Sequence, residues 1–278
     1  MAASFDRVNH DILMGLVAKR VADKRILKLI RGFLTAGVLA DGLVSPTEEG
    51  TPQGGPLSPL LSNLMLDVLD KELERRGHNF VRYADDCNIY VRSQRGGERV
   101  MASIERFLAK HLKLKVNKAK SAVARPGKRK FLGFGFTNGK QLRRRIAPQS
   151  RARFRSRVRE LTRRTRGSSL AQIIKELSVY LIGWRGYFGF CETPSVLRDL
   201  DKWTRRRLRA IVWKQWRYGP TRFAKLRRCG VGPALAAKTA GSPRGPWRLS
   251  NSPALAIALS NALFKSLGLA TVAVPKPA

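Results

Sequence analysis

The segment Phe80–Val91, which reads FVRYADDCNIYV, constrains the fold of this chain more than any other stretch. Apolar, β-branched and aromatic residues lie on both sides of Asp85 and Asp86, and they predict two strands, Asn79–Tyr83 and Cys87–Val91. The residues between the strands suit a tight turn. The sequence therefore predicts a hairpin with two adjacent carboxylates at its tip.

Two neighbouring carboxylates on a hydrophobic hairpin repel each other and lose solvation unless a cation neutralises them. When the chemistry is phosphoryl transfer, the usual neutraliser is a pair of divalent metal ions about 4 Å apart. The alternative is a plain polar turn, because Asp is common in hairpin turns.

A second informative segment, Glu49–Asn63, reads EGTPQGGPLSPLLSN and precedes a helical pattern that runs to about Arg76. Its Gly54–Pro56 stretch carries little side chain, so its backbone can approach a nucleotide closely. Ser58 is predicted to be the N-cap of the helix, with Pro59 at the first helical position.

These two segments, in this order and about twenty residues apart, resemble a reverse transcriptase. The matching stretches are Thr51–Gly54, Ser58-Pro59, Asn63 and Tyr83–Asp86, and the closest family is the bacterial group II intron-encoded reverse transcriptase/maturase. The resemblance implies an α+β fold: a palm with an antiparallel sheet and packed helices, followed by an α-helical thumb/maturase domain. It implies a partial palm at 1–140, a basic helical thumb at 141–228, and a linker with a C-terminal extension at 229–278.

The start of the chain resembles the end of the first catalytic motif of the same family. Phe5-Asp6 matches the last aromatic and the second Asp of that motif, which places the essential carboxylate just before Met1. We therefore expect an N-terminally truncated protein, without fingers, that extends a primer feebly or not at all. A genuine start, a gene fragment and a wrongly chosen start codon stay open.

Other segments agree with a palm. Gly37–Gly50 is predicted to be a hairpin and Gly96–Leu112 a helix. By themselves Leu114–Lys120 and Phe131–Phe136 would be ordinary strands. In this order they resemble the last two palm motifs, of which one carries a basic residue near the nucleotide phosphates and the other is a hairpin that grips the primer strand.

The resemblance implies roles for individual residues. Asp85 would hold metal with the assistance of Asp86, and the complete family site takes two Mg²⁺ ions. Phe5 would be the ring that blocks a ribose 2′-hydroxyl, Gln53 and Gly54 would line the nucleotide and template pocket, and Lys118 or Lys120 would meet phosphate.

The charge of the chain is concentrated in its second half. The chain carries 55 Lys and Arg against 19 Asp and Glu. Residues 1–126 hold 21 basic and 14 acidic residues, a net +7, whereas residues 127–278 hold 34 and 5, a net +29. Such an excess calls for a polyanion, and nucleic acid is the natural one.

Arg143–Arg166 is the most basic segment, and helix is favoured there because no strand-like alternation of apolar residues accompanies it. Two further helical patterns follow between Ser169 and Arg217, separated near Gly189–Pro194. Their interleaved aromatics and arginines suit RNA, although most of the Trp residues are better explained as helix-bundle core. The segment resembles the family's maturase domain, and the predicted RNA contacts are Arg151, Arg155, Arg159, Arg185, Arg205, Arg206 and Arg209.

The remaining signals are weaker. Cys229–Arg248 is rich in Gly, Pro and small residues and is predicted to be a loop or linker. Pro253–Leu269 has helical spacing, is expected to pack onto the body and is a poor membrane span. Three scattered cysteines support neither a disulfide framework nor a zinc cluster. We expect a cytoplasmic protein.

The implied function is RNA-directed DNA polymerase, a nucleotidyltransferase, with a splicing-maturase role. The implied partners are group II intron RNA, an RNA template, a DNA primer or target and deoxynucleotides, with no membrane. One alternative is a catalytically inactive, truncated remnant that acts only as an RNA-binding maturase-like protein. Another is a generic basic RNA-binding protein, against which the two motifs argue.

Overall fold

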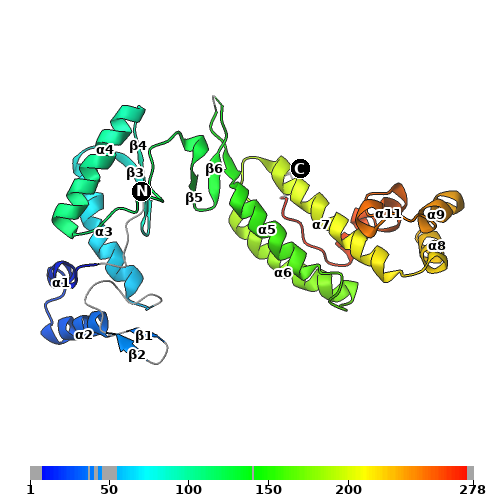
Figure 1. Cartoon of the computed structure of the whole chain (residues 1–278), viewed down its shortest axis with the longest axis horizontal. Helices are drawn as coiled ribbons and strands as arrows, with labels where there is room; N and C mark the ends of the chain where they lie inside the picture. Colours follow the sequence, from blue (N-terminus) through cyan, green and yellow to red (C-terminus); the bar gives the residue numbers. More distant parts are fainter. Residues whose placement is uncertain (1–7, 37, 41–42, 46–54, 140, 274–278) are drawn as a thin grey trace. The chain divides into compact units, whose positions relative to one another are not determined.

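A computed structural model describes residues 8–36, 38–40, 43–45, 55–139 and 141–273 (Figure 1). The chain forms two compact units, Met1–Arg125 and Pro126–Ala278, and each is considered by itself. Both combine helices with short antiparallel strands, which confirms the α+β class.

The first unit contains most of the elements that the sequence predicts. Polar side chains begin its helices: the side-chain oxygens of Asn9, Asp23 and Ser93 accept from the backbone N–H groups of Ile12, Arg25 and Gly96. Its elements are α1 (His10–Ala18), α2 (Lys24–Thr35), β1 (Val38–Ala40), β2 (Leu43–Ser45), α3 (Ser58–Arg75), β3 (Asn79–Tyr83), β4 (Asp86–Tyr90) and α4 (Gln94–Phe107), which continues into a π-helical turn at Leu108–Leu112.

Helix α3 is the centre of the hydrophobic core of this unit. Four of its buried residues recur every four positions, with Leu66 beside them, which places them on one face that packs against α1 and β3. The prediction that Ser58 caps this helix is wrong: Leu57 occupies the N-cap without a side-chain hydrogen bond, and Ser58 is the first helical residue. The buried residues are Leu61, Met65, Leu66, Leu69 and Leu73.

Both predicted hairpins of the first unit are confirmed. In β1–β2, Ala40 pairs with Leu43; in β3–β4, Tyr83 pairs with Asp86. The strand expected at Leu114–Lys120 is wrong. Only Val116 forms a bridge there, and residues 118–120 make a turn in which the Asn117 side chain accepts from the Lys120 N–H, so the backbone leaves the extended path.

The second unit opens with a three-stranded antiparallel sheet in the order β5-β6-β7, formed by Lys130–Phe131, Phe134–Phe136 and Arg144–Ile146. Positive φ angles at Leu132 (50°) and Gly133 (77°) make the tight turn of the predicted Phe131–Phe136 hairpin. A helix starting at Arg143 is wrong: β7 comes first, because it pairs with β6, and the helix begins at Pro148. By contacts all three strands group with the second unit, although a palm at 1–140 was expected to contain β5 and β6.

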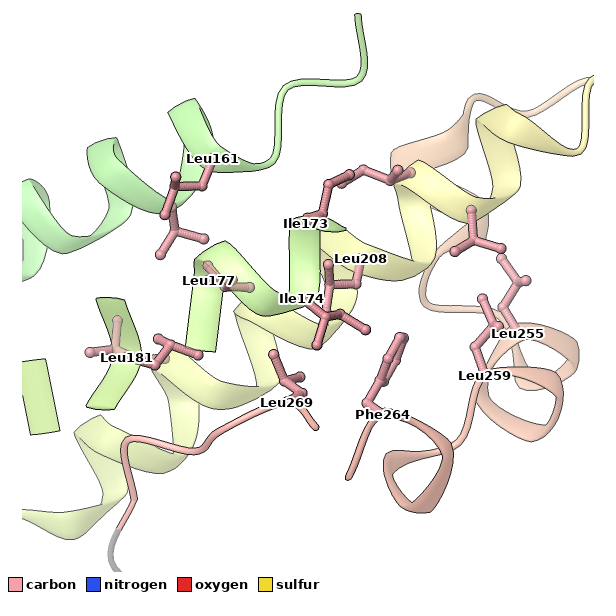
Figure 2. Packing of buried hydrophobic residues seen from close by; sticks show 14 of the residues in the cluster. Leu161, Ile173, Ile174, Leu177, Leu181, Leu208, Leu255, Leu259, Phe264 and Leu269 are labelled. Atoms are coloured by element: carbon pink, nitrogen blue, oxygen red, sulfur yellow. The ribbon is translucent and has the colours of Figure 1, made fainter. Parts of the chain in front are cut away.

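Three long helices form the body of this unit: α5 (Pro148–Leu161), α6 (Leu170–Phe188) and α7 (Pro194–Gln215). The two helical patterns predicted between Ser169 and Arg217 are thereby confirmed. Trp213 is fully buried and Trp184 is nearly so, as expected for helix-bundle core. Figure 2 shows how Ile174 and Leu208 lie beside Phe264 and Leu269 from the C-terminal segment.

The C-terminal part of the second unit is helical. A loop or linker at Cys229–Arg248 is wrong: α9 and α10 fill most of it, because small residues let α9 pack closely on α8 while α10 packs on α7. The tail is two short helices, and its apolar side chains are largely buried, as expected. The bounds are Gly219–Arg228 for α8, Pro233–Ala240 for α9, Pro246–Leu249 for α10, Pro253–Ala258 for α11 and Asn261–Ser266 for α12.

Residues 268–273 form an extended strap that lies against α6 and α7. The buried Asp201 carboxylate of α7 accepts from the N–H groups of Val272 (2.9 Å) and Ala273 (3.0 Å). The Ser178 hydroxyl of α6 accepts from the Ala270 N–H and donates to the Gly268 carbonyl. Burial raises the pKa of Asp201, and these two N–H bonds oppose that effect.

None of the described helices combines the length and the apolar character that a membrane crossing requires.

The strap gives a first prediction. Asp201→Ala should lower the free energy of unfolding by about 1–3 kcal/mol, because two buried N–H groups lose their acceptor. Urea unfolding followed by Trp fluorescence measures this. Asp199→Ala is the control, since Asp199 is exposed on the same helix and should change little. Equal effects of the two variants would show that the strap does not depend on Asp201.

Candidate functional site

The β3–β4 hairpin presents its two carboxylates to solvent. Ala84 and Asp85 form the turn, Asp86 is the first residue of β4, and both acids are exposed. Asp86 shares the outer face of the hairpin with Tyr83, because residues that pair across antiparallel strands point to the same side. Ala84 has a φ of 50°, which is uncommon for an L-residue other than Asn or Asp.

The opposite face of the hairpin packs on the helices. Cys87 is 2% exposed, and burial raises the pKa of its thiol to about 11. Phe80 and Ile89, which pair across the strands, contact the same core. The period-two alternation of the strands therefore puts the carboxylates outside and the apolar anchors inside.

Arg82 ties this hairpin to α3. Its Nε and Nη2 atoms donate to the Asp70 carboxylate at 2.6–3.0 Å, and its Nη1 atom donates to Asn63 Oδ1 and to the Ala84 carbonyl, both at 2.9 Å. The Asp70 hydrogen bonds raise the pKa of Arg82. Sequence reasoning did not single out Arg82 or Asp70; the signal was a basic residue inside an otherwise apolar strand.

The hairpin offers a partial metal site. The described residues contain no cluster of three or more His, Cys, Asp or Glu side chains. Asp11, the nearest described acid to the chain start, is paired with Arg31 at 2.7 Å. Two exposed carboxylates nevertheless suit Mg²⁺, which usually takes one or two carboxylates together with water and substrate phosphates.

The other residues expected near the nucleotide are only partly placed. Phe5, Gln53 and Gly54 lie outside the described residues. Lys118 and Lys120 lie in the exposed turn that follows Val116. A nucleotide pocket built from these side chains stays a prediction.

A second site is a basic groove on the helical unit, between the end of α5 and the end of α7 with the start of α8. Seven cationic side chains line it against a single carboxylate, Glu160, which pairs with Arg157 at 2.8 Å. Burial, followed by the nearby charges of Arg159 and Arg164, lowers the pKa of Arg207. The cationic residues are Arg159, Arg163, Arg164, Arg207, Lys214, Arg217 and Arg222.

The seven arginines predicted to bind RNA fall into different surroundings. Arg155 and Arg159 are exposed and lie 5.8 and 5.7 Å from the Trp203 ring centroid. Arg159 lines the groove. Arg151 is half-buried, and its Nε atom has no partner in the described structure. Arg205 is half-buried on α7.

Arg185, Arg206 and Arg209 contact the C-terminal segment. The Arg206 guanidinium stacks 4.0 Å from the Trp247 ring centroid and donates to the Trp247 carbonyl. Arg209 donates to the Leu259 carbonyl at 2.9 Å, and Arg185 lies 3.4 Å from the Thr271 carbonyl. These side chains connect elements of the fold, and their positions on α6 and α7 do not by themselves distinguish this use from RNA binding.

The buried face of the hairpin gives a second prediction. At pH 8 a thiol-selective reagent should modify exposed Cys229 quickly and Cys87 very slowly. With a pKa of about 11, only about one Cys87 thiol in a thousand is ionised at that pH. Mass spectrometry of peptides after timed labelling measures both rates. Unfolding in urea should equalise them, and equal rates in the native protein would contradict the buried position.

Comparisons with known proteins identify both units. Residues 1–136 match the family described as "Reverse transcriptase (RNA-dependent DNA polymerase)", and residues 151–230 match "Group II intron, maturase-specific domain". The first match includes the Phe131–Phe136 hairpin, whereas contacts place that hairpin in the second unit.

Individual relatives match over shorter stretches. Protein YkfC of Escherichia coli is 42% identical over 76 residues, 27% of this chain and 20% of its own length. The group II intron-encoded protein LtrA of Lactococcus lactis is 46% identical over 67 residues, 24% of this chain and 11% of its own. An uncharacterized 91 kDa protein in the cob intron of Schizosaccharomyces pombe is 38% identical over 78 residues, 28% and 10%. These alignments span at most a fifth of each relative.

Proposed function

We propose that this chain, which belongs to the family of group II intron-encoded reverse transcriptases and maturases, supplies palm and thumb elements for RNA-directed DNA synthesis. The observation that carries the proposal is the Asp85-Asp86 tip, exposed on a hairpin that is anchored to α3, the helix in which the Glu49–Asn63 sequence motif ends.

Each predicted site residue would have its own role in nucleotidyl transfer. Asp85 and Asp86 would hold Mg²⁺, which supplies the positive charge that activates a primer 3′ oxygen and stabilises the leaving pyrophosphate. Lys118 or Lys120 would meet the phosphates of a deoxynucleotide, and Gln53 and Gly54 would line its pocket with Phe5 against the ribose. An RNA template and a DNA primer are the expected substrates.

The basic groove supports binding of structured RNA, including a group II intron RNA in a maturase role. Burial and, after it, the charges of Arg159 and Arg164 lower the pKa of Arg207, and a polyanion that enters beside these cations would stabilise the charged guanidinium. Half-buried Trp203 gathers Arg155, Arg159 and Arg207 through cation–π contacts, with guanidinium carbons 5.5–5.8 Å from its ring centroid.

The polymerase proposal is tested by primer extension on an RNA template with Mg²⁺. Two forms are assayed: the chain Met1–Ala278, and the same chain extended at its N-terminus by a family segment that carries the first catalytic carboxylate. Asp85→Asn should reduce the rate of the active form by about 100-fold or more, equal to ~2.7 kcal/mol of barrier. Glu74→Gln, at an exposed carboxylate of α3, should change it little.

The same assay separates the polymerase from the binding-only alternative. If neither form extends a primer while RNA binding persists, the chain acts as a maturase-like binding protein. If extension is robust but does not depend on Asp85, the hairpin is not the metal site.

The groove gives a separate prediction for RNA. Simultaneous replacement of exposed Arg163, Arg164 and Arg217 by Gln should weaken RNA binding. It should also reduce the magnitude of the slope of log K against log salt by about 2–3, because fewer phosphate contacts form and fewer counterions are released on binding. Filter binding between low and physiological salt measures the slope.

The control for the groove variant changes the same net charge elsewhere on the helical unit. Lys175, Arg198 and Lys202 are exposed on α6 and α7 and do not line the groove. Their replacement with Gln should leave most of the slope in place. Equal losses from the two triple variants would show that net charge, and not the groove, sets the affinity.

A further inference from the structure

Arg82 connects three parts of the first unit that come from different places in the sequence. Its guanidinium donates to Asp70 in the middle of α3, to Asn63 in the first turns of α3, and to the carbonyl of Ala84 inside the hairpin turn. Only 12% of its side chain is exposed. One planar group thus fixes the distance between the helix and the turn.

The geometry of this contact is specific to arginine. Nε and Nη2 form a bidentate pair with the Asp70 carboxylate, and this leaves Nη1 directed at Asn63 and Ala84. A lysine could neutralise Asp70, but a single ammonium lacks the planar fork that reaches all three acceptors at once.

Arg82 contacts a turn whose backbone conformation is unfavourable without support from neighbouring groups. Ala84 has a φ of 50°, a conformation that costs an L-residue free energy and persists where surrounding contacts fix it. The next two residues are Asp85 and Asp86, both exposed. Without the bond to the Ala84 carbonyl, the orientation of these carboxylates depends on the hairpin alone.

The contact with Asn63 connects Arg82 to the segment that is expected to bind the nucleotide. It ends the Glu49–Asn63 segment, which is expected to approach the incoming nucleotide, and its Oδ1 atom lies 2.9 Å from Arg82 Nη1. The same guanidinium therefore donates to α3, the helix that follows the expected nucleotide-binding residues in the chain, and to the turn that bears the expected metal ligands.

We propose that Arg82, held by Asp70, is a positioning residue that fixes the Asp85-Asp86 turn relative to the start of α3. A metal ion on the turn and a nucleotide near the start of α3 would then be held at a constant separation. The proposal rests on the polymerase function proposed above. It assigns Arg82 no contact with substrate.

The contacts of Arg82 with Asp70, Asn63 and Ala84, here called the clamp, are tested on the chain Met1–Ala278 by a measurement that needs no enzymatic activity. Hydrogen exchange of residues 83–87 is followed by mass spectrometry in the wild type, Arg82→Lys and Arg82→Met. Exchange of the turn amides should rise about 10-fold or more in both variants, while the α3 core at 65–73 keeps its protection. Arg92→Met is the control, because Arg92 is exposed just after β4 and should leave the turn unchanged.

Two results would overturn the clamp. Turn exchange that is unchanged in both variants would show that the hairpin holds Ala84 without Arg82. Equal acceleration throughout α3 and the turn, in Arg82→Lys as in Arg82→Met, would show that the residue only supports global stability. Asp70→Asn is the milder second variant if Arg82→Met does not fold, and it should loosen the turn as well.

The positioning role is tested by primer extension with the N-terminally extended form, at a temperature where every variant is fully folded. Arg82→Lys should lower kcat about 10-fold or more and shift the Mg²⁺ dependence to higher concentration, which a simple loss of stability would not do. An unchanged kcat and Mg²⁺ dependence overturns the role. If the wild type fails to extend a primer, the polymerase function fails and the catalytic role with it, whereas the exchange result still decides the clamp.

Discussion

Within each unit of this protein, guanidinium groups stabilise the packing by donating to carbonyls and carboxylates of elements distant in the sequence. Arg82 joins β3 to α3 through Asp70. On α7, Arg207 donates to the hydroxyl and the carbonyl of Thr162, and Arg209 donates to the Leu259 carbonyl. Each contact satisfies polar groups that would otherwise be buried without a partner, which is costly in a protein interior. Arginine can do this because its planar fork serves several acceptors at once.

This use of arginine resolves an apparent conflict in the second unit. A net charge of +29 over residues 127–278 destabilises a compact state by self-repulsion. The unit reduces that penalty by stacking guanidinium groups on rings, as Arg206 does on Trp247 and Arg222 on Trp213. The cations that are exposed in the groove keep their repulsion until a polyanion neutralises it. Structural arginines and candidate RNA contacts thus occur on the same helices and differ in what they touch.

The arrangement of the β3–β4 hairpin follows a simpler rule. Strand alternation places Cys87 in the core and Asp86 in solvent one residue away, so one face of the hairpin is anchored and the other exposes the candidate metal ligands. Helix α3 supplies both the buried surface under the hairpin and the Asp70 and Asn63 acceptors for Arg82. A single helix therefore supports the packing of the unit and the placement of its acids.

The sequence by itself determined the local elements and the family. The β3–β4 hairpin, the α6 and α7 helices and the acid tip were predictable, because alternation, helical periodicity and two spaced motifs are local signals. It did not determine the partner of each arginine: Arg206 and Arg209 have the same local pattern as exposed Arg155, and only packing against the C-terminal segment separates them. The small residues of α9 suggest a loop in the sequence, but in the structure they allow this helix to pack closely on α8. Likewise, the sequence did not show that Arg82 pairs with Asp70, which is twelve residues away. Long-range contacts decide these cases, since the free energy of a buried charge depends on what the fold brings next to it.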